Sequence, residues 1–428
     1  MHPAPPRAPV SRYPRARKCI SLCHSERFTQ LSALLAEWEH FWRTAPFRHP
    51  VLPWATRHPE LVQELSALTD QDVERLQADI LAVSPLSLRL PVADLARLTS
   101  LPPLSRDLEP LPRTWSPHIG RRKWQQIEAF VAHVGAEPGR RQVDWCAGKG
   151  HLSRVLARRH DATVVALEAQ ESLCSEGLRL AQLQGASVRM VQQDVLASGV
   201  EHWLQEGPHV SALHACGALH ERLLEVAVQT GCSITLAPCC YQRISSTKYW
   251  PMSRMGRELA RKHGMHLSRE DLALAVQETI TAPRSDRIAR ARRNAWRLGF
   301  DLMQRKLRGI DEYLHLPSLS HGRMPSNFEA FCHWAGAQKG LPIPAQYDWP
   351  TLEREGWRRY REVSRLELVR HLFRRPLEVW LVLDRLHFLE EAGFRVELGT
   401  FCTRDLTPRN LLLRARPSAT VPPAAERA

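Results

Sequence analysis

The spacing of hydrophobic positions changes along this chain of 428 residues. Within 25–111, apolar residues recur every three or four positions, which predicts amphipathic helices. From 142 to 240, short apolar and β-branched runs alternate with helical stretches, which predicts a parallel sheet with helices on both faces. After residue 241 the spacing is helical again. Two last strands, at 395–401 and 410–414, lie so close together that only a hairpin can join them.

These changes predict the domain organisation. Residues 25–111 are expected to form a helical N-terminal domain. The sheet and its closing hairpin form an α/β domain over 118–415, and the hairpin makes its last strand antiparallel. A helical insertion, 242–370, follows the fifth strand. The flanking segments 1–24 and 416–428 are expected to be disordered; the first is rich in Pro and Arg and contains no acid.

Polar side chains lie where the predicted strands end. Asp144 ends the first strand, Glu168 the second, Asp194 the third and His214 the fourth. Ligands of open parallel sheets bind at the carboxyl ends of the strands. We therefore expect these four side chains to line one site.

A glycine-rich turn, Ala147-Gly148-Lys149-Gly150, follows the first strand. Glycine permits positive φ and lets a ligand approach the backbone closely. The third glycine of the dinucleotide-binding fingerprint is replaced by Ser153, which disfavours a pyrophosphate site and a nicotinamide-linked oxidoreductase. A nucleoside ligand without phosphates fits the turn better.

Three spaced motifs resemble one family. They are Ala147-Gly148-Lys149-Gly150-His151-Leu152-Ser153, His214-Ala215-Cys216-Gly217 and Pro238-Cys239-Cys240, and Thr407-Pro408-Arg409-Asn410 near the last strand is a further similar feature. The arrangement resembles the class I S-adenosylmethionine-dependent methyltransferases. Within that class it is most similar to a subgroup containing a tRNA ribose methyltransferase and the glutathione-transferase-C-terminal-domain-containing proteins. The resemblance implies a Rossmann-like seven-stranded sheet with an antiparallel last strand.

The resemblance also implies a cofactor, S-adenosyl-L-methionine, and roles for the strand-end residues. Asp144 would steady the ammonium of its methionine moiety, and the loop of Ala147, Gly148 and Gly150 would approach that moiety. Glu168 would accept both ribose hydroxyls and Asp194 the adenine amino group; His214 also lies at this edge. Carboxylates accept hydrogen bonds only, so they suit these donors.

Five residues are candidates for the chemistry: His214, Tyr241, Cys239, Cys240 and Lys123. A hydroxyl or amine acceptor can need a base to remove its proton. His214 and Tyr241 follow strand ends, and Lys123 approaches from a preceding helix. The two cysteines could be nucleophiles, although buried thiols more often pack as small apolar groups. No metal site is expected, since cysteines and histidines lack zinc-finger spacing.

The charge of the chain points to an acidic partner. The formal net charge is +14, and residues 254–308 hold 14 Lys and Arg against 6 Asp and Glu. Aromatic residues interleave with these charges: Trp250, Trp296, Tyr313, Trp334, Trp357 and Tyr360. Such an insertion could bind RNA through phosphates and stacked bases; equally, it could be a helical cap with a solvated basic surface.

Together these features predict a methyltransferase acting on RNA, either tRNA or rRNA. The alternatives are a protein methyltransferase and a non-catalytic nucleic-acid-binding protein that keeps the fold. Scattered cysteines, including the adjacent pair 239–240, indicate reduced thiols and a cytoplasmic setting. No apolar run approaches the roughly 18 residues that span a bilayer, so no membrane partner is expected.

Overall fold

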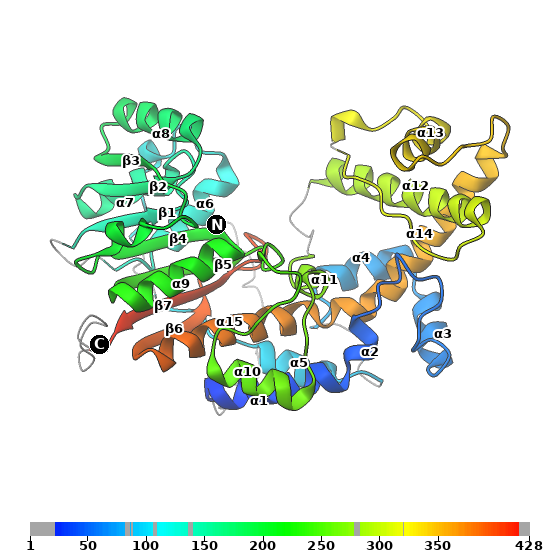
Figure 1. Cartoon of the computed structure of the whole chain (residues 1–428), viewed down its shortest axis with the longest axis horizontal. Helices are drawn as coiled ribbons and strands as arrows, with labels where there is room; N and C mark the ends of the chain where they lie inside the picture. The colour runs from blue at the N-terminus through cyan, green and yellow to red at the C-terminus, as the bar shows by residue number, and fades with distance from the viewer. Residues whose placement is uncertain are drawn as a thin grey trace, which may run out of the picture.

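A seven-stranded sheet dominates the left half of the molecule in Figure 1. The computed structural model describes residues 22–418 except 82–85, 87–88, 106–108, 136–139, 278–282 and 320. The strands are β1 (Gln142–Trp145), β2 (Val164–Glu168), β3 (Val188–Gln192), β4 (His209–Cys216), β5 (Ser233–Cys239), β6 (Phe394–Thr400) and β7 (Leu411–Pro417). Their order in the sheet is β3-β2-β1-β4-β5-β7-β6.

The pairing of the strands confirms the predicted fold class. β1 to β5 pair in parallel, whereas β7 runs antiparallel to both β5 and β6. The β1, β2 and β5 side chains are buried throughout, as expected for strands covered on both faces. The order of strands reverses beside β1, so β1 and β4 flank the switch point where ligands of such sheets bind.

Helices from the first half of the α/β domain cover the sheet. They are α6 (Arg121–Val131), α7 (His151–His160), α8 (Glu171–Leu183) and α9 (Ala218–Thr230). α7 packs on β1 and β2, and α9 packs on β4 and β5. Each of the connections from β1 to β3 and from β4 to β5 contains one of these helices, which is the crossover that parallel neighbours need.

The N-terminal helices share a core with the sheet domain. They are α1 (His24–Glu37), α2 (Glu39–Trp42), α3 (Pro59–Ala67), α4 (Asp70–Ala78) and α5 (Val92–Thr99). α1 packs along α15 (Arg374–Glu391), where Phe28 meets the Trp380 ring at 5.3 Å. Trp380 donates its indole N–H to Ser32 at 2.9 Å. One continuous apolar cluster joins these helices to β1, β4 and β5.

The segment between β5 and α15 divides into two parts. α10 (Arg254–His263) and α11 (Arg269–Leu274) pack against α15. α12 (Arg284–Arg308), α13 (Phe328–Lys339) and α14 (Trp349–His371) form a lobe on the right in Figure 1. The lobe has its own core around Trp296, Phe300 and Phe331, while α14 also contacts α2, α3 and α4.

A buried polar network fastens the insertion to the sheet. Asp384 on α15 accepts hydrogen bonds from Tyr249 and from the backbone and hydroxyl of Ser253. The neighbouring Arg385 donates to Tyr249 at 2.7 Å and to His220 Nε2 at 2.9 Å. His220 therefore carries its proton on Nδ1, which donates to a backbone carbonyl of β4. Buried charges need such partners, so this network sets one orientation of α15 under the sheet.

Two elements reach into the segments that are predicted to be disordered. α1 already begins at His24, and β7 continues to Pro417, two residues into the segment predicted as a tail. Pairing with β6 explains the extension, because Phe394 lies opposite Pro417. The rest of the predicted disordered segments, 1–21 and 419–428, lies outside the described residues. In the described part of the chain, no helix combines the length and apolarity needed to cross a bilayer.

Candidate active site

The turn after β1 has left-handed backbone at three positions. Cys146, Gly148 and Gly150 have φ of 59°, 58° and 62°. At Gly148 a Cβ would meet no atom within 4 Å, so the loop faces open space there. At Gly150, the residue before α7, a Cβ would press on the Met190 sulfur at 3.2 Å. The two glycines thus serve different needs: Gly148 leaves room above the loop, and Gly150 lets helix and strand pack closely.

Asp144 is the most deeply buried acid of this edge, with 2% of its surface exposed. Its carboxylate accepts a 2.6 Å hydrogen bond from the Ser153 hydroxyl on α7. Loss of hydration on burial raises the pKa of Asp144 to about 7, although Ser153 and Lys123 oppose the shift. A cation placed beside this carboxyl would favour its charged form.

Glu168 ends β2 and reaches back to the glycine turn. One carboxylate oxygen accepts from Gly148 N–H at 2.9 Å, and the other accepts from Gln170 N–H at 3.0 Å. A carboxylate oxygen has more than one lone pair, so each oxygen can accept a further hydrogen bond from a ligand. Glu168 is therefore held in place by the backbone of both turns.

Asp194 lies beyond the end of β3 and is exposed. Its carboxylate accepts from Leu196 N–H at 2.9 Å, which fixes an Asx-type turn. Leu196 is itself 52% exposed. An exposed apolar side chain beside the Asp194 carboxylate suits a ligand with a planar ring whose edge carries a hydrogen-bond donor.

His214 occupies a bulge at the end of β4. Leu213 pairs with Ala237 and Ala215 with Pro238, so His214 is the extra residue between them, and its φ is 64°. Its Nε2 lies 3.2 Å from the Gln126 side-chain oxygen on α6. Burial and nearby Lys123 lower the pKa of His214 to about 4, so the ring is neutral at neutral pH. Bulges often re-aim side chains next to active sites.

The structure separates the remaining two candidate bases. Lys123 is exposed on the first turn of α6, near enough to influence the pKa values of Asp144 and His214. Tyr241 is fully buried under the Arg385 guanidinium, which lies 5.3 Å from its ring centroid. Burial raises the pKa of Tyr241 well above its usual value, so its hydroxyl is a poor base. We therefore interpret Tyr241 as a core residue.

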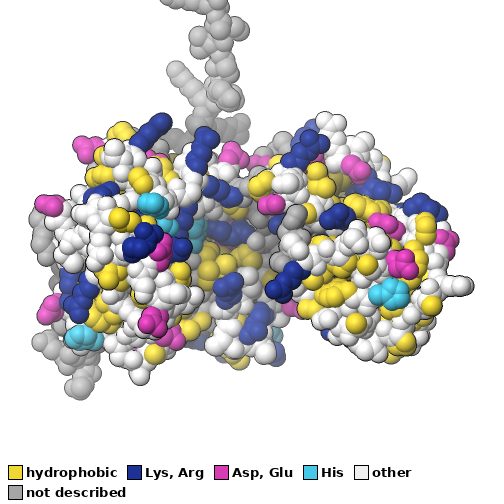
Figure 2. Space-filling view, turned by 90° about the horizontal axis from the view of Figure 1, so that it is seen from above, with side chains coloured by type: hydrophobic (Ala, Val, Ile, Leu, Met, Phe, Trp, Pro, Cys, Tyr) yellow, Lys and Arg dark blue, Asp and Glu magenta, His cyan; other side chains and the backbone are white. Residues whose placement is uncertain are grey.

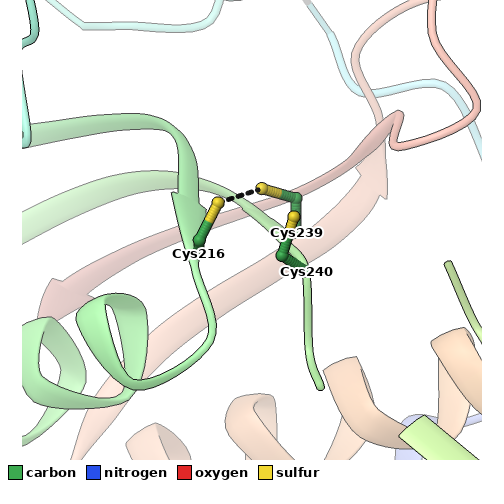
Figure 3. A group of neighbouring side chains, drawn as sticks. All are labelled: Cys216, Cys239 and Cys240. Atoms are coloured by element: carbon green, nitrogen blue, oxygen red, sulfur yellow. Dashed lines mark hydrogen bonds between the residues drawn. The ribbon is translucent and has the colours of Figure 1, made fainter. Parts of the chain in front are cut away.

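A third thiol, that of Cys216, lies beside Cys239 and Cys240, and the sequence pattern assigned it no role. Cys216 ends β4 directly opposite Cys239 on β5, and their Sγ atoms are 3.3 Å apart. Figure 3 shows these two sulfurs facing each other with Cys240 beside them. Hydrogen bonds with Cys216 and Cys239 lower the pKa of Cys240, whereas hydrogen bonds with Cys216 and Cys240 raise the pKa of Cys239. The sequence does not reveal that Cys216 joins the other two, because its pairing with Cys239 depends on the shift in strand register at the His214 bulge.

Comparison with known proteins identifies the domain that carries these residues. Residues 122–247 match a family model described as a methyltransferase domain. The matched segment holds β1 to β5 in the order 3-2-1-4-5 with the antiparallel pair beyond. This chain contains a methyltransferase domain.

Curated relatives of the methyltransferase domain are longer proteins. The glutathione S-transferase C-terminal domain-containing protein of Bos taurus is 32% identical over 190 residues, which are 41% of this chain and 29% of the relative. The Mus musculus protein is 33% identical over the same shares, and the Drosophila melanogaster homologue is 26% identical over 31% of this chain and 23% of its own. The chain thus spans less than a third of these relatives. A solved structure, YjhP from E. coli, covers 37% of this chain and 65% of its own at 19% identity, but its TM-score of 0.23 lends no support to the fold.

A basic cavity of about 1460 Å³ lies between the methyltransferase domain's insertion and the N-terminal helices. Its walls carry ten arginines and three glutamates: Arg43, Arg48, Arg75, Arg269, Arg287, Arg290, Arg293, Arg297, Arg370, Arg374, Glu74, Glu270 and Glu367. In Figure 2, blue side chains gather along the hollow between the two halves of the molecule. Gln242 also lines the cavity, two residues after Cys240, so the cavity reaches the turn that follows β5.

The aromatic residues of the insertion mostly pack inside the lobe. Trp296 is 3% exposed and lies in its core, and the Trp334 ring lies tilted against the core residue Phe331 with a centroid distance of 5.5 Å. Tyr313, Trp357 and Tyr360 are half-buried, and Tyr360 also lines the basic cavity. Of the six aromatics singled out in the sequence, Trp250 alone is exposed, at 71%. The interleaving of aromatics and charges is therefore mainly a property of packed helices.

Proposed function

We propose that this protein is an S-adenosyl-L-methionine-dependent methyltransferase whose substrate is RNA. The methyltransferase domain supports transfer of a methyl group. The cofactor is inferred from the acids at the strand ends, and the RNA substrate from the basic cavity. The cavity is the observation that favours RNA over other acceptors.

The residues at the strand ends fit the proposed cofactor. Open space above Gly148 leaves room for the methionine moiety beside the turn. Asp144 offers a buried carboxyl to the ammonium, Glu168 offers held oxygens to a diol, and Asp194 offers an acceptor beside an apolar surface. These carboxyls lie at the ends of three neighbouring strands, in the order in which an extended nucleoside would meet them.

When bound, the sulfonium of the cofactor supplies an activated methyl group. The protein's own task is to align the acceptor and exclude water. The neutral His214 ring can accept a proton from a hydroxyl of the methyl acceptor. It can also hold that hydroxyl by a hydrogen bond, so that the oxygen lone pair points at the methyl group. A pKa of about 4 makes His214 a weak base, so positioning is its larger contribution.

RNA is favoured as the acceptor by the charge and location of the cavity. Its arginines outnumber its acids by ten to three, and several are already held by backbone carbonyls. Arg293 donates to Leu319 O at 3.1 Å and Arg297 to Leu316 O at 3.2 Å. Guanidinium groups held in this way keep their charge uncompensated and offer further N–H donors to phosphates. The cavity leads to Gln242, next to the end of β5 where the acceptor must approach.

The test is transfer of labelled methyl groups from S-adenosyl-L-methionine into fractionated RNA and protein. We expect label in RNA that RNase removes and protease leaves. Gly148→Arg is the matched inactive control, because its side chain would fill the space above the loop. Protease-sensitive label would assign a protein substrate instead. RNA binding without cofactor binding would indicate a non-catalytic RNA-binding protein.

A further inference from the structure

Three thiols converge at the carboxyl ends of β4 and β5, outside the set of acids that the proposed cofactor needs. The sulfur atoms of Cys216, Cys239 and Cys240 all lie within 4.8 Å of one another (Figure 3). Cys239 is 5% exposed, whereas Cys216 and Cys240 are half-buried. The cluster is thus reachable from solvent on one side and enclosed by the sheet on the other.

The backbone that carries these thiols is held in an unusual geometry. The bulge at His214 shifts the register of β4 by one residue, which brings Cys216 opposite Cys239. Gly217 follows with φ 52°, and a Cβ there would lie 2.2 Å from Arg243 O. Gly217 N–H donates to Cys239 O at 3.0 Å, and Arg243 N–H donates to Cys240 O at 2.9 Å. The two turns are therefore bonded to each other, and the thiols are placed by the backbone rather than by flexible side chains.

Strained backbone is concentrated at the same place. Cys240 has φ 47° and His214 has φ 64°, although neither is a glycine. Such conformations are unfavourable for residues other than glycine and persist where the surrounding structure imposes them, often at ligand sites. A purely apolar packing role for the cysteines would not need them.

We propose that Cys216, Cys239 and Cys240 bind one zinc ion through three sulfur ligands, leaving the fourth position to an exogenous ligand. Tetrahedral zinc with Zn–S bonds of about 2.3 Å separates its sulfurs by about 3.8 Å, which the observed spacing can reach with small side-chain rotations. Within the described part of the chain, no further His, Cys, Asp or Glu ligand atom joins this group. Three thiolates select a soft metal.

The surroundings can carry the charge of such a site. Zinc with three thiolates has a net charge of −1, and Arg243 and Arg409 lie close enough to act electrostatically on Cys240. Arg409 belongs to the Thr407-Pro408-Arg409-Asn410 segment, whose role the fold alone did not explain. Each thiol that binds as thiolate releases its proton to solvent, and the oxidation state of the metal is unchanged. The fourth ligand is a water molecule or an atom of the substrate, because the basic cavity reaches the turn beside the cluster and gives both access to it.

This proposal does not depend on methyl transfer, and its test measures metal directly. The full chain, freed of any purification tag, should retain about one equivalent of zinc by elemental mass spectrometry. Cys216→Ser, Cys239→Ser and Cys240→Ser should each reduce retained zinc at least tenfold. Cys174→Ser is the matched control, a half-buried thiol near Glu168 that lies outside the cluster, and it should keep the metal.

A second measurement uses the wild-type chain, so a variant that fails to fold does not obscure the result. After zinc is removed by a chelator, added Co²⁺ should produce the visible bands and thiolate charge-transfer absorption of a tetrahedral sulfur-rich site. Three results would each overturn the proposal: a metal-free protein whose three thiols react freely, a Cys216–Cys239 disulfide in peptide maps of freshly purified protein, or one equivalent of copper or iron in place of zinc.

Discussion

The edge of the sheet and the basic cavity are built in opposite ways. At the edge, each polar residue lies near the end of its own strand and is held by a group on an adjacent turn or helix, as Gly148 N–H holds Glu168 and the Ser153 hydroxyl holds Asp144. The cavity is assembled from distant segments. Arg43 on the N-terminal side pairs with Asp271 on α11 at 2.9 Å, and Arg287 on α12 pairs with Glu74 on α4.

This difference determines how each region should respond to substitution. Residues at the edge make few, short contacts in fixed positions, so a single change there should have a large effect. The cavity acts through the sum of many charges, so each arginine should contribute little to RNA affinity. Its contribution should be measurable only through the salt dependence of binding. The following substitutions test that contrast, beginning with the largest expected effect.

Gly148→Arg should abolish cofactor binding, with affinity for S-adenosyl-L-methionine falling more than 100-fold in titration calorimetry. The new side chain would occupy the open space above the turn, and φ 58° would strain its backbone. Gly185→Arg is the matched control: it has φ 57° and equally open space, but precedes β3 at the opposite edge of the sheet. Equal loss in both variants would show that backbone strain, rather than a blocked site, is responsible.

Much of the edge could be predicted because its chemistry is local. Alternating strands and helices fixed which residues end a strand, and parallel strands bring those ends together. The thiol cluster could not be predicted in the same way, since Cys216 meets Cys239 only after the bulge at His214. Tyr241, a candidate base in the sequence, lies in the core, and a position after a strand does not reveal whether the side chain turns inward.

The cavity escaped prediction for a different reason. The sequence showed a basic insertion, but ten of the 29 residues that line the cavity come from the N-terminal part of the chain, which pairs with residues more than 200 positions later. Nor does charge along a helix show which arginines share a face. Arg290 and Arg293 line the cavity, whereas Arg292 lies over the Trp296 ring at 5.3 Å.

Asp144→Asn should change the pH dependence of stability. The carboxyl has a pKa of about 7 in the folded protein and about 4 in the unfolded chain, so between these values the folded state holds a proton that the unfolded state has lost. Stability of the ligand-free protein should therefore fall as pH rises from 4 to 8, by at most about 4 kcal/mol for a shift of about 3 units. Denaturant unfolding at several pH values measures it.

Asp144→Asn should lose the fall in stability between pH 4 and 8. Ser153→Ala should move that fall to higher pH, because the Ser153 hydroxyl stabilises the charged form of Asp144. Identical pH profiles for wild type and Asp144→Asn would show that Asp144 is hydrated in solution. Such a result would weaken the contrast between a rigid, buried edge and an open cavity.

Glu168→Ala should weaken cofactor affinity by about 1–3 kcal/mol, because the ribose hydroxyls lose a charged acceptor. Glu168→Gln sharpens the measurement, since its amide oxygen can still accept from Gly148 N–H and keep the turn in place. If Glu168→Gln loses some affinity for the cofactor, but less than Glu168→Ala, the loss in Glu168→Gln is due to the missing negative charge. Glu171→Ala, an exposed acid at the start of α8, is the control, and unchanged affinity in Glu168→Ala would contradict the assignment of the β2 end.

The smallest effect is expected in the cavity. Replacing Arg290 and Arg293 with glutamine should weaken RNA binding across sequences and reduce the slope of log affinity against log salt by about 1 for each phosphate that is no longer neutralised. Arg292→Gln removes the same charge from the same helix outside the cavity, so it should leave the slope nearly unchanged. Fluorescence anisotropy at several salt concentrations distinguishes the variants. If all three arginines lowered the slope equally, RNA would be held by the general charge of α12, and the cavity would be no more than a gap between helices.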